Sequence, residues 1–177
     1  AGFGNTPEPE VPYGVEDYSN DVEQLIDGLG LKSVTLVGHS FGGRVAIYLV
    51  SSGRVNVKQL VLVDSAGLKP RRGLVYKIKV AYYKRLKMRV REGKVKPQVL
   101  EKFGSSDYKV LSPIMKQTFL KVVNLDLLEF ASTIKLKTLI VWGRYDKDTP
   151  MYMARKLNRL IEGSRLVVYP AGHYSYV

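Results

Sequence analysis

Short apolar runs rich in β-branched residues alternate along the chain with longer segments in which apolar residues recur at helical spacing. The runs predict buried strands at 34–37, 60–63, 138–143 and 165–168. The helical spacing predicts helices over 17–30, from Phe41 to the break at Ser51-Ser52-Gly53, and over 151–161. Strand, helix and strand at this spacing predict an α/β fold with a mostly parallel sheet and crossover helices.

The pattern changes between residues 69 and 133. Apolar residues repeat there at every fourth position, at Leu74, Ile78, Tyr82, Leu86 and Val90. This spacing predicts one helix, and further helical stretches are predicted over 114–123 and 125–130. We therefore divide the chain into one part of the core at 1–68, a helical insert at 69–133 and the rest of the core at 134–177.

The segment Gly38-His39-Ser40-Phe41-Gly42 lies between the first predicted strand and the helix that follows it. A serine at such a corner is typical of a nucleophile elbow, which exposes the hydroxyl at the N-terminus of a helix. Flanking glycines remove side chains that would collide in the strained turn, and the helix N-terminus favours developing negative charge. Ser40 is therefore the candidate nucleophile. The alternative is a tight turn with an idle serine.

A nucleophilic serine needs a base, and the chain contains two histidines, His39 and His173. Adjacent residues leaving a strand point to opposite sides, so His39 should face away from the Ser40 hydroxyl and serve a structural role. His173 follows the last predicted strand, at the sheet edge that carries functional groups in open α/β sheets. We therefore predict His173 as the base.

Three aspartates could hold the imidazole in the required tautomer, namely Asp146, Asp148 and Asp64. Asp146 comes three residues after the strand over 138–143, and we select it as the acid. Asp148 is instead expected as the N-cap or turn residue of the helix that begins near Pro150. Asp64 ends the strand over 60–63 and stays an alternative acid. The chain order Ser, Asp, His is the order expected for α/β-hydrolases.

These residues make the chain similar to members of the α/β-hydrolase superfamily with a helical cap. The resemblance rests on Ala1-Gly2-Phe3-Gly4, the elbow at 38–43, Trp142-Gly143-Arg144-Tyr145-Asp146 with Thr149-Pro150, and Ala171-Gly172-His173. It implies the triad Ser40, Asp146 and His173, with the Phe41 N–H as the first oxyanion donor. It also implies that the insert at 69–133 is the cap and that Asp64 is not the acid of the triad.

Members of this family carry further strands before the Gly-Phe-Gly loop, including the turn that supplies the second oxyanion donor. They also close with a helix after the histidine loop, whereas this sequence starts at Ala1 and stops at Val177. The resemblance therefore implies an internal segment of a longer hydrolase, truncated at both ends.

The elbow serine argues against dehalogenase and epoxide hydrolase chemistry, for which members of this fold use aspartate. We expect a carboxylic-ester hydrolase; thioesterase, lipase, C–C bond hydrolase and perhydrolase activities are not separated by the sequence. Apolar cap residues suggest a small apolar acyl substrate, and they are Leu111, Ile114, Met115 and Phe119. The alternatives are a non-catalytic ligand-binding relative and an inactive fragment.

The net charge of +12 is concentrated in the predicted cap. Residues 69–102 contain thirteen Lys or Arg and two acids, Glu92 and Glu101. We interpret this excess first as the solvated face of a lid, and second as weak contact with a membrane surface. Steering of anionic substrates comes third, and no nucleic-acid-binding motif supports a nucleic-acid partner.

The absence of cysteine excludes disulfides and thiolate chemistry. Two distant histidines and the pair Asp146 and Asp148 do not predict a metal site, and Gly2-Phe3-Gly4 lacks the context of a phosphate-binding loop. The expected mechanism is therefore free of cofactors. No apolar run is long enough to span a membrane, and the expected location is the cytoplasm.

Overall fold

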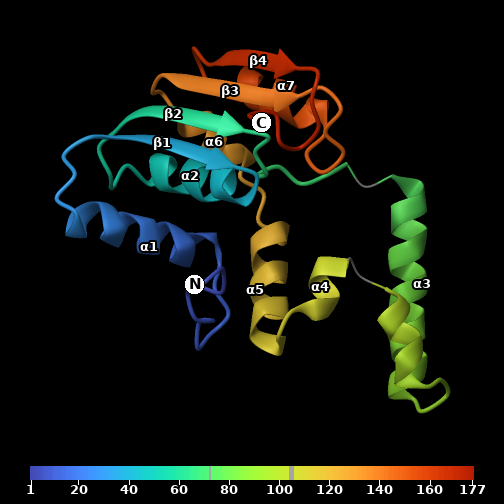
Figure 1. Ribbon diagram of the computed structural model, residues 1–177. Helices are drawn as coiled ribbons and strands as arrows, with labels where there is room; N and C mark the ends of the chain where they lie inside the picture. Colours follow the sequence, from blue (N-terminus) through green and yellow to red (C-terminus); the bar gives the residue numbers. More distant parts are fainter. Residues whose placement is uncertain (72, 104–105) are drawn as a thin grey trace.

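Four parallel strands form one sheet in the computed structural model of the protein, which describes residues 1–71, 73–103 and 106–177 (Figure 1). The strands are β1 (Val34–His39), β2 (Val57–Val63), β3 (Thr138–Gly143) and β4 (Arg165–Tyr169), in the order β1-β2-β3-β4. Register pairs His39 with Val63, Val63 with Val141, and Gly143 with Tyr169. The carboxyl ends of all four strands therefore meet at one edge of the sheet, as the predicted α/β fold requires.

Helices α2 (Phe41–Ser52), α6 (Leu128–Thr133) and α7 (Met151–Leu160) pack around one main core with the sheet. Alternate strand residues supply that core, so the face of β2 and β3 that carries Leu60, Leu62, Ile140 and Trp142 is fully buried. Helix α1 (Val15–Gly28) packs against α2. It begins two residues before the predicted start because Asp17 accepts the backbone N–H of Gly14, which satisfies a donor at the helix N-terminus.

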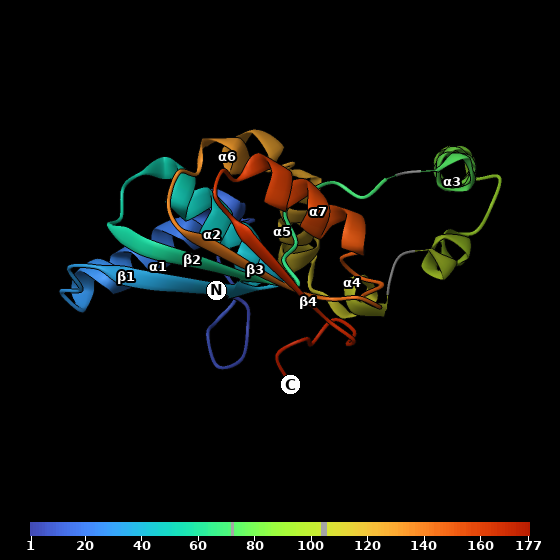
Figure 2. The same cartoon turned by 90° about the horizontal axis from the view of Figure 1, so that it is seen from above.

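The chain between β2 and β3 forms α3 (Leu74–Arg91), η1 (Pro97–Lys102), α4 (Ser106–Val110) and α5 (Pro113–Asn124) before α6. Helix α5 stands beside the carboxyl edge of the sheet, whereas α3 and η1 lie away from it (Figures 1 and 2). The Leu127 N–H donates to Gly67 O at 2.9 Å, so the two ends of this insert meet at the end of β2. Helices α3 and α5 match two of the helices expected in the insert, whereas the third, expected over 125–130, is found three residues later as α6. The assignment of 69–133 as a cap stays a prediction.

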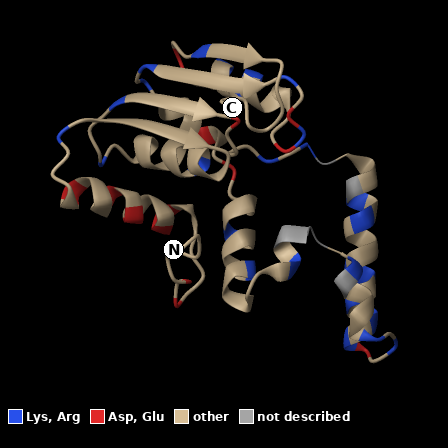
Figure 3. Ribbon diagram, viewed as in Figure 1, with Lys and Arg blue, Asp and Glu red and all other residues tan. Residues whose placement is uncertain are grey.

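Charge is distributed unevenly over the molecule, with acidic residues along α1 and basic residues along α3 (Figure 3). Residues 1–31 contain seven Asp or Glu and no Lys or Arg. Arg72, one of the thirteen basic residues of 69–102, lies outside the described residues. None of the helices in the described part of the chain is both long and apolar enough to cross a bilayer.

Candidate active site

Ser40 occupies a sharp turn between β1 and α2. Its backbone has φ of +49° and ψ of −113°, a strained conformation that residues other than glycine rarely adopt. Such strain is found mostly at functional sites. Two glycines make room for this turn. A Cβ on Gly38 would lie 2.6 Å from Gly43 Cα, and a Cβ on Gly43 would lie 2.0 Å from Ser65 Oγ. The local sequence thus brings the strand, the helix and the loop after β2 into direct contact below Ser40.

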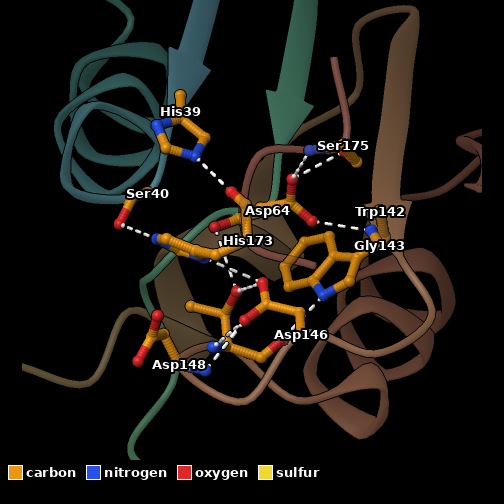
Figure 4. Close-up of polar contacts among 10 residues, drawn as sticks. His39, Ser40, Asp64, Trp142, Gly143, Asp146, Asp148, His173 and Ser175 are labelled. Atoms are coloured by element: carbon orange, nitrogen blue, oxygen red, sulfur yellow. Dashed lines mark hydrogen bonds and ion pairs between the residues drawn. The ribbon is translucent and has the colours of Figure 1, made fainter. Parts of the chain in front are cut away.

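The structure brings Ser40, His173 and Asp146 together in one line of hydrogen bonds at the carboxyl edge of the sheet (Figure 4). His173 Nε2 lies 2.9 Å from Ser40 Oγ, and His173 Nδ1 lies 2.9 Å from Asp146 Oδ2. An ionised carboxylate only accepts hydrogen bonds, so Nδ1 carries the proton and Nε2 is left to accept from the serine hydroxyl. The loops after β1, β3 and β4 supply one side chain each.

Asp146 is buried and surrounded by donors. Its Oδ1 accepts the N–H groups of Asp148 at 2.8 Å and Thr149 at 2.9 Å, while Oδ2 accepts the Thr149 hydroxyl at 2.5 Å in addition to His173. Burial raises the pKa of Asp146, but the hydrogen bonds from His173, Thr149 and Asp148 outweigh it and hold this pKa below its ordinary value. The side chain is therefore an anion with a fixed orientation.

The N-terminus of α2 and a cavity lie on the open side of Ser40. Phe41 is the first residue of α2, and N–H groups in the first turn of a helix have no acceptor within the helix. The cavity has a volume of about 400 Å³. Its walls include Ser40 and Phe41, together with Phe3, Leu111, Met115, Phe119 and Val122. Of the four apolar cap residues predicted to line the pocket, Leu111, Met115 and Phe119 do so, and Ile114 does not.

Comparison with known proteins finds similarity to α/β-hydrolases along the chain. A profile described as alpha/beta hydrolase fold matches residues 1–79. An AB hydrolase superfamily protein of Bacillus subtilis is 27% identical over 99% of this chain and 72% of its own length. The chain has the α/β-hydrolase fold and is similar over its length to proteins of that superfamily.

Two further relatives show the range of proteins to which this chain is similar. A 2-hydroxy-6-oxo-2,4-heptadienoate hydrolase of Pseudomonas putida is 28% identical over 98% of this chain and 69% of its own length. The solved structure of an esterase from Exiguobacterium antarcticum superposes with a TM-score of 0.71 and 26% identity, covering 99% of this chain and 73% of that one. The chain thus spans about 70% of the length of these relatives.

Asp64, the alternative acid, is not hydrogen-bonded to His173, and its partners in the described part of the chain are other residues. Its buried side chain accepts the Gly143 N–H at 2.7 Å on Oδ1, and the Ser175 N–H at 2.9 Å and hydroxyl at 2.6 Å on Oδ2. It therefore ties the end of β2 to β3 and to the loop that carries His173 (Figure 4). Sequence reasoning missed this role, because the contact with Ser175 joins residues 111 positions apart.

Asp148 and His39 also have supporting places. Two roles were expected for Asp148, the N-cap of α7 or a turn residue. Pro150 is the N-cap residue of α7, and Asp148 is exposed in the turn after β3, which confirms the second role. Asp146 takes the N–H groups of this turn instead, which leaves Asp148 as a turn residue. His39 Nε2 lies 2.7 Å from the backbone oxygen of His173, so it contacts the histidine loop rather than the Ser40 hydroxyl.

Asp146, Asp148 and His173 each offer one ligand atom, and these atoms lie within 4.8 Å of one another. The donors of the turn and the imidazole already occupy both oxygens of Asp146. His173 Nε2 is likewise directed at Ser40. Hydrogen bonding therefore accounts for this cluster.

Proposed function

We propose that this α/β-hydrolase is a cofactor-free serine hydrolase that cleaves a carboxylic ester or a related acyl substrate. One observation carries the proposal: Ser40, His173 and Asp146 form a continuous line of hydrogen bonds that ends at a cavity. Each residue stands where acyl transfer needs a nucleophile, a base and an orienting carboxylate.

The proposed reaction begins when His173 Nε2 accepts the Ser40 proton and Ser40 Oγ attacks the acyl carbon. The oxyanion that forms is stabilised by the Phe41 N–H and the N-terminus of α2. Asp146 stabilises the imidazolium, which then gives its proton to the leaving alkoxide as the carbon–oxygen bond breaks. Water, activated by His173, attacks the acyl-enzyme, and the return of the proton to Ser40 releases the acid.

The walls of the cavity support an acyl group that is apolar next to the reacting carbonyl. Phe3, Met115 and Phe119 are among its side chains, and burial of each methylene of a substrate contributes about 0.8 kcal/mol. One relative is an esterase and another is a hydrolase of a heptadienoate. Cleavage of an ester bond and of a C–C bond both fit a triad of this form. We propose the ester as the first substrate class to test.

Helix α3 supports the further proposal of weak contact with an anionic membrane surface. It carries seven Lys or Arg and no Asp or Glu over Leu74–Arg91. Its side chains at Leu74, Val75, Ile78 and Tyr82 are more than half exposed, so apolar and cationic groups share one surface, as in helices that lie on a bilayer. A cytoplasmic location stays a prediction beside it.

The test is a series of 4-nitrophenyl esters from acetate to octanoate. We expect hydrolysis that rises from acetate to the medium chain lengths, and a loss of at least 10³-fold in Ser40→Ala. Ser52→Ala, at the other end of α2, is the matched control and should keep the wild-type rate. Equal hydrolysis by Ser40→Ala and wild type would contradict the proposal and would favour a non-catalytic ligand-binding protein.

A further inference from the structure

Arg44 is a buried cation in the wall of the cavity. It lies on α2, four residues after Ser40, so about 6 Å separates the two positions along the helix axis. The residue is 5% exposed, and it lines the same cavity as Ser40. Burial lowers the pKa of Arg44 to about 10, which leaves the guanidinium charged at neutral pH.

The protein provides a hydrogen-bond acceptor for only some of the N–H groups of the Arg44 guanidinium. Its Nη1 donates to Leu125 O at 2.5 Å, and among the described residues Leu125 supplies its one hydrogen-bond acceptor. No ion pair joins Arg44 to a carboxylate in the described part of the chain. The charge of the nearby Asp126 raises the pKa of Arg44, but the Asp126 side chain accepts the Leu128 N–H and no hydrogen bond joins it to the guanidinium. A guanidinium has five N–H donors, so most of them are not used by the protein.

The unused donors must reach open space. Among the described residues, every buried side-chain nitrogen or oxygen atom has a hydrogen-bond partner, so a nitrogen of Arg44 without one is accessible. Arg44 lines the cavity, whose walls near α5 are mostly apolar: Met115, Phe119, Val122 and Val123 lie there beside one polar residue, Thr118. An anion placed there would meet a charged fork beside apolar walls, and hydrogen bonds to a charged group are strong.

We propose that the cavity accepts acyl groups that end in a carboxylate, with Arg44 as the residue that determines this specificity. This inference rests on the proposed serine hydrolase function. The acyl carbonyl lies at Ser40, an apolar chain of a few methylenes contacts α5, and the far carboxylate binds the guanidinium. The bond to Leu125 O holds the guanidinium in place, so the site is preorganised for a planar, bidentate anion.

The test compares two esters of equal length, 4-nitrophenyl hydrogen adipate and 4-nitrophenyl adipamate, which differ in a terminal carboxylate or amide. We expect wild type to favour the carboxylate by about 10- to 100-fold in kcat/KM, as expected for hydrogen bonds to a charged group. Arg44→Gln should bring this ratio to about one. Arg44→Lys keeps the charge but not the fork, so its ratio should fall between the two.

A net charge of +12 attracts any anion, and Arg54→Gln controls for that effect. Arg54 is exposed at the end of α2 and binds Glu23, so its loss removes the same charge without touching the cavity. Its ratio should equal that of wild type at each salt concentration. A wild-type ratio near one, or an equal fall in Arg54→Gln and Arg44→Gln, would overturn the inference.

Binding gives a readout that needs no turnover. Calorimetry on Ser40→Ala should show that monomethyl adipate binds at least tenfold more tightly than methyl adipamate, and that adding Arg44→Lys reduces this difference. Equal binding of the two ligands would overturn the inference even if Arg44→Gln failed to fold. Selective binding without hydrolysis of any ester by the wild type would instead contradict the proposed function alone.

Discussion

At the scale of single residues, two buried aspartates at neighbouring strand ends have different partners. Asp146 is hydrogen-bonded to the imidazole of His173. Asp64 instead accepts hydrogen bonds from Gly143 at the end of β3 and from Ser175 in the loop that carries His173. Both follow apolar strands, so their sequence contexts are alike. Their separate roles come from the order of the strands, because β3 lies between β2 and β4.

Asp64→Asn should loosen the histidine loop. The amide that replaces one carboxylate oxygen would face an N–H donor of Gly143 or Ser175, leaving a buried polar group unsatisfied at a cost of about 1–3 kcal/mol. Thermal unfolding should show a lower Tm, and ester hydrolysis should fall as well. Asp148→Asn changes an exposed carboxylate nearby and should leave the Tm unchanged. Equal Tm values for the two variants would contradict the role of Asp64.

Asp146 should make stability depend on acid. Because its pKa is lower in the folded state than in the unfolded chain, it contributes stability above the ordinary aspartate pKa of about 4 and loses it as pH falls through the lower folded value. The Tm of wild type should therefore drop more steeply below pH 4 than that of Asp146→Asn. Glu162→Gln, which removes an exposed partner of Lys135, should follow the wild-type profile closely. Parallel profiles for wild type and Asp146→Asn would refute this assignment.

At the scale of elements, the sequence was sufficient for the strands and most helices, because their periodicity is local. The predicted strand over 138–143 coincides with β3. The segment from Leu74 to Val90, with apolar residues at every fourth position, coincides with α3. Long-range contacts were not predictable in this way. Neither the bond from Arg44 to Leu125 nor the one from Ser175 to Asp64 has a signal in the spacing of either residue.

The exposed surface of α3 predicts binding to anionic vesicles. Three exposed lysines of this helix are Lys77, Lys84 and Lys87. Replacing all three with Glu should abolish sedimentation with vesicles that contain phosphatidylserine, because each basic residue contributes about 1 kcal/mol of binding free energy near such a surface. The control reverses Lys32, Lys58 and Lys137, which are exposed around the sheet. Binding that is equal in both triple variants, or insensitive to salt, would remove the membrane proposal.

At the scale of the whole molecule, the sheet collects the site from distant parts of the chain. Ser40, Asp146 and His173 lie on loops after β1, β3 and β4, and parallel strands bring these loops to one edge. The elbow motif and the scarcity of histidine made this arrangement predictable from sequence. The cavity was less predictable, since Arg44 and Thr118 line it and only packing of α5 beside α2 places them there.

Labelling with a fluorophosphonate probe, followed by intact-mass measurement, tests the central claim most directly. The probe reacts with a serine only where a base and an oxyanion site activate it. We predict one adduct on the wild type and none on Ser40→Ala, with His173→Gln slowed by at least a hundredfold and circular dichroism unchanged. A folded wild-type protein that forms no adduct, or one that is labelled equally after Ser40→Ala, would contradict the account.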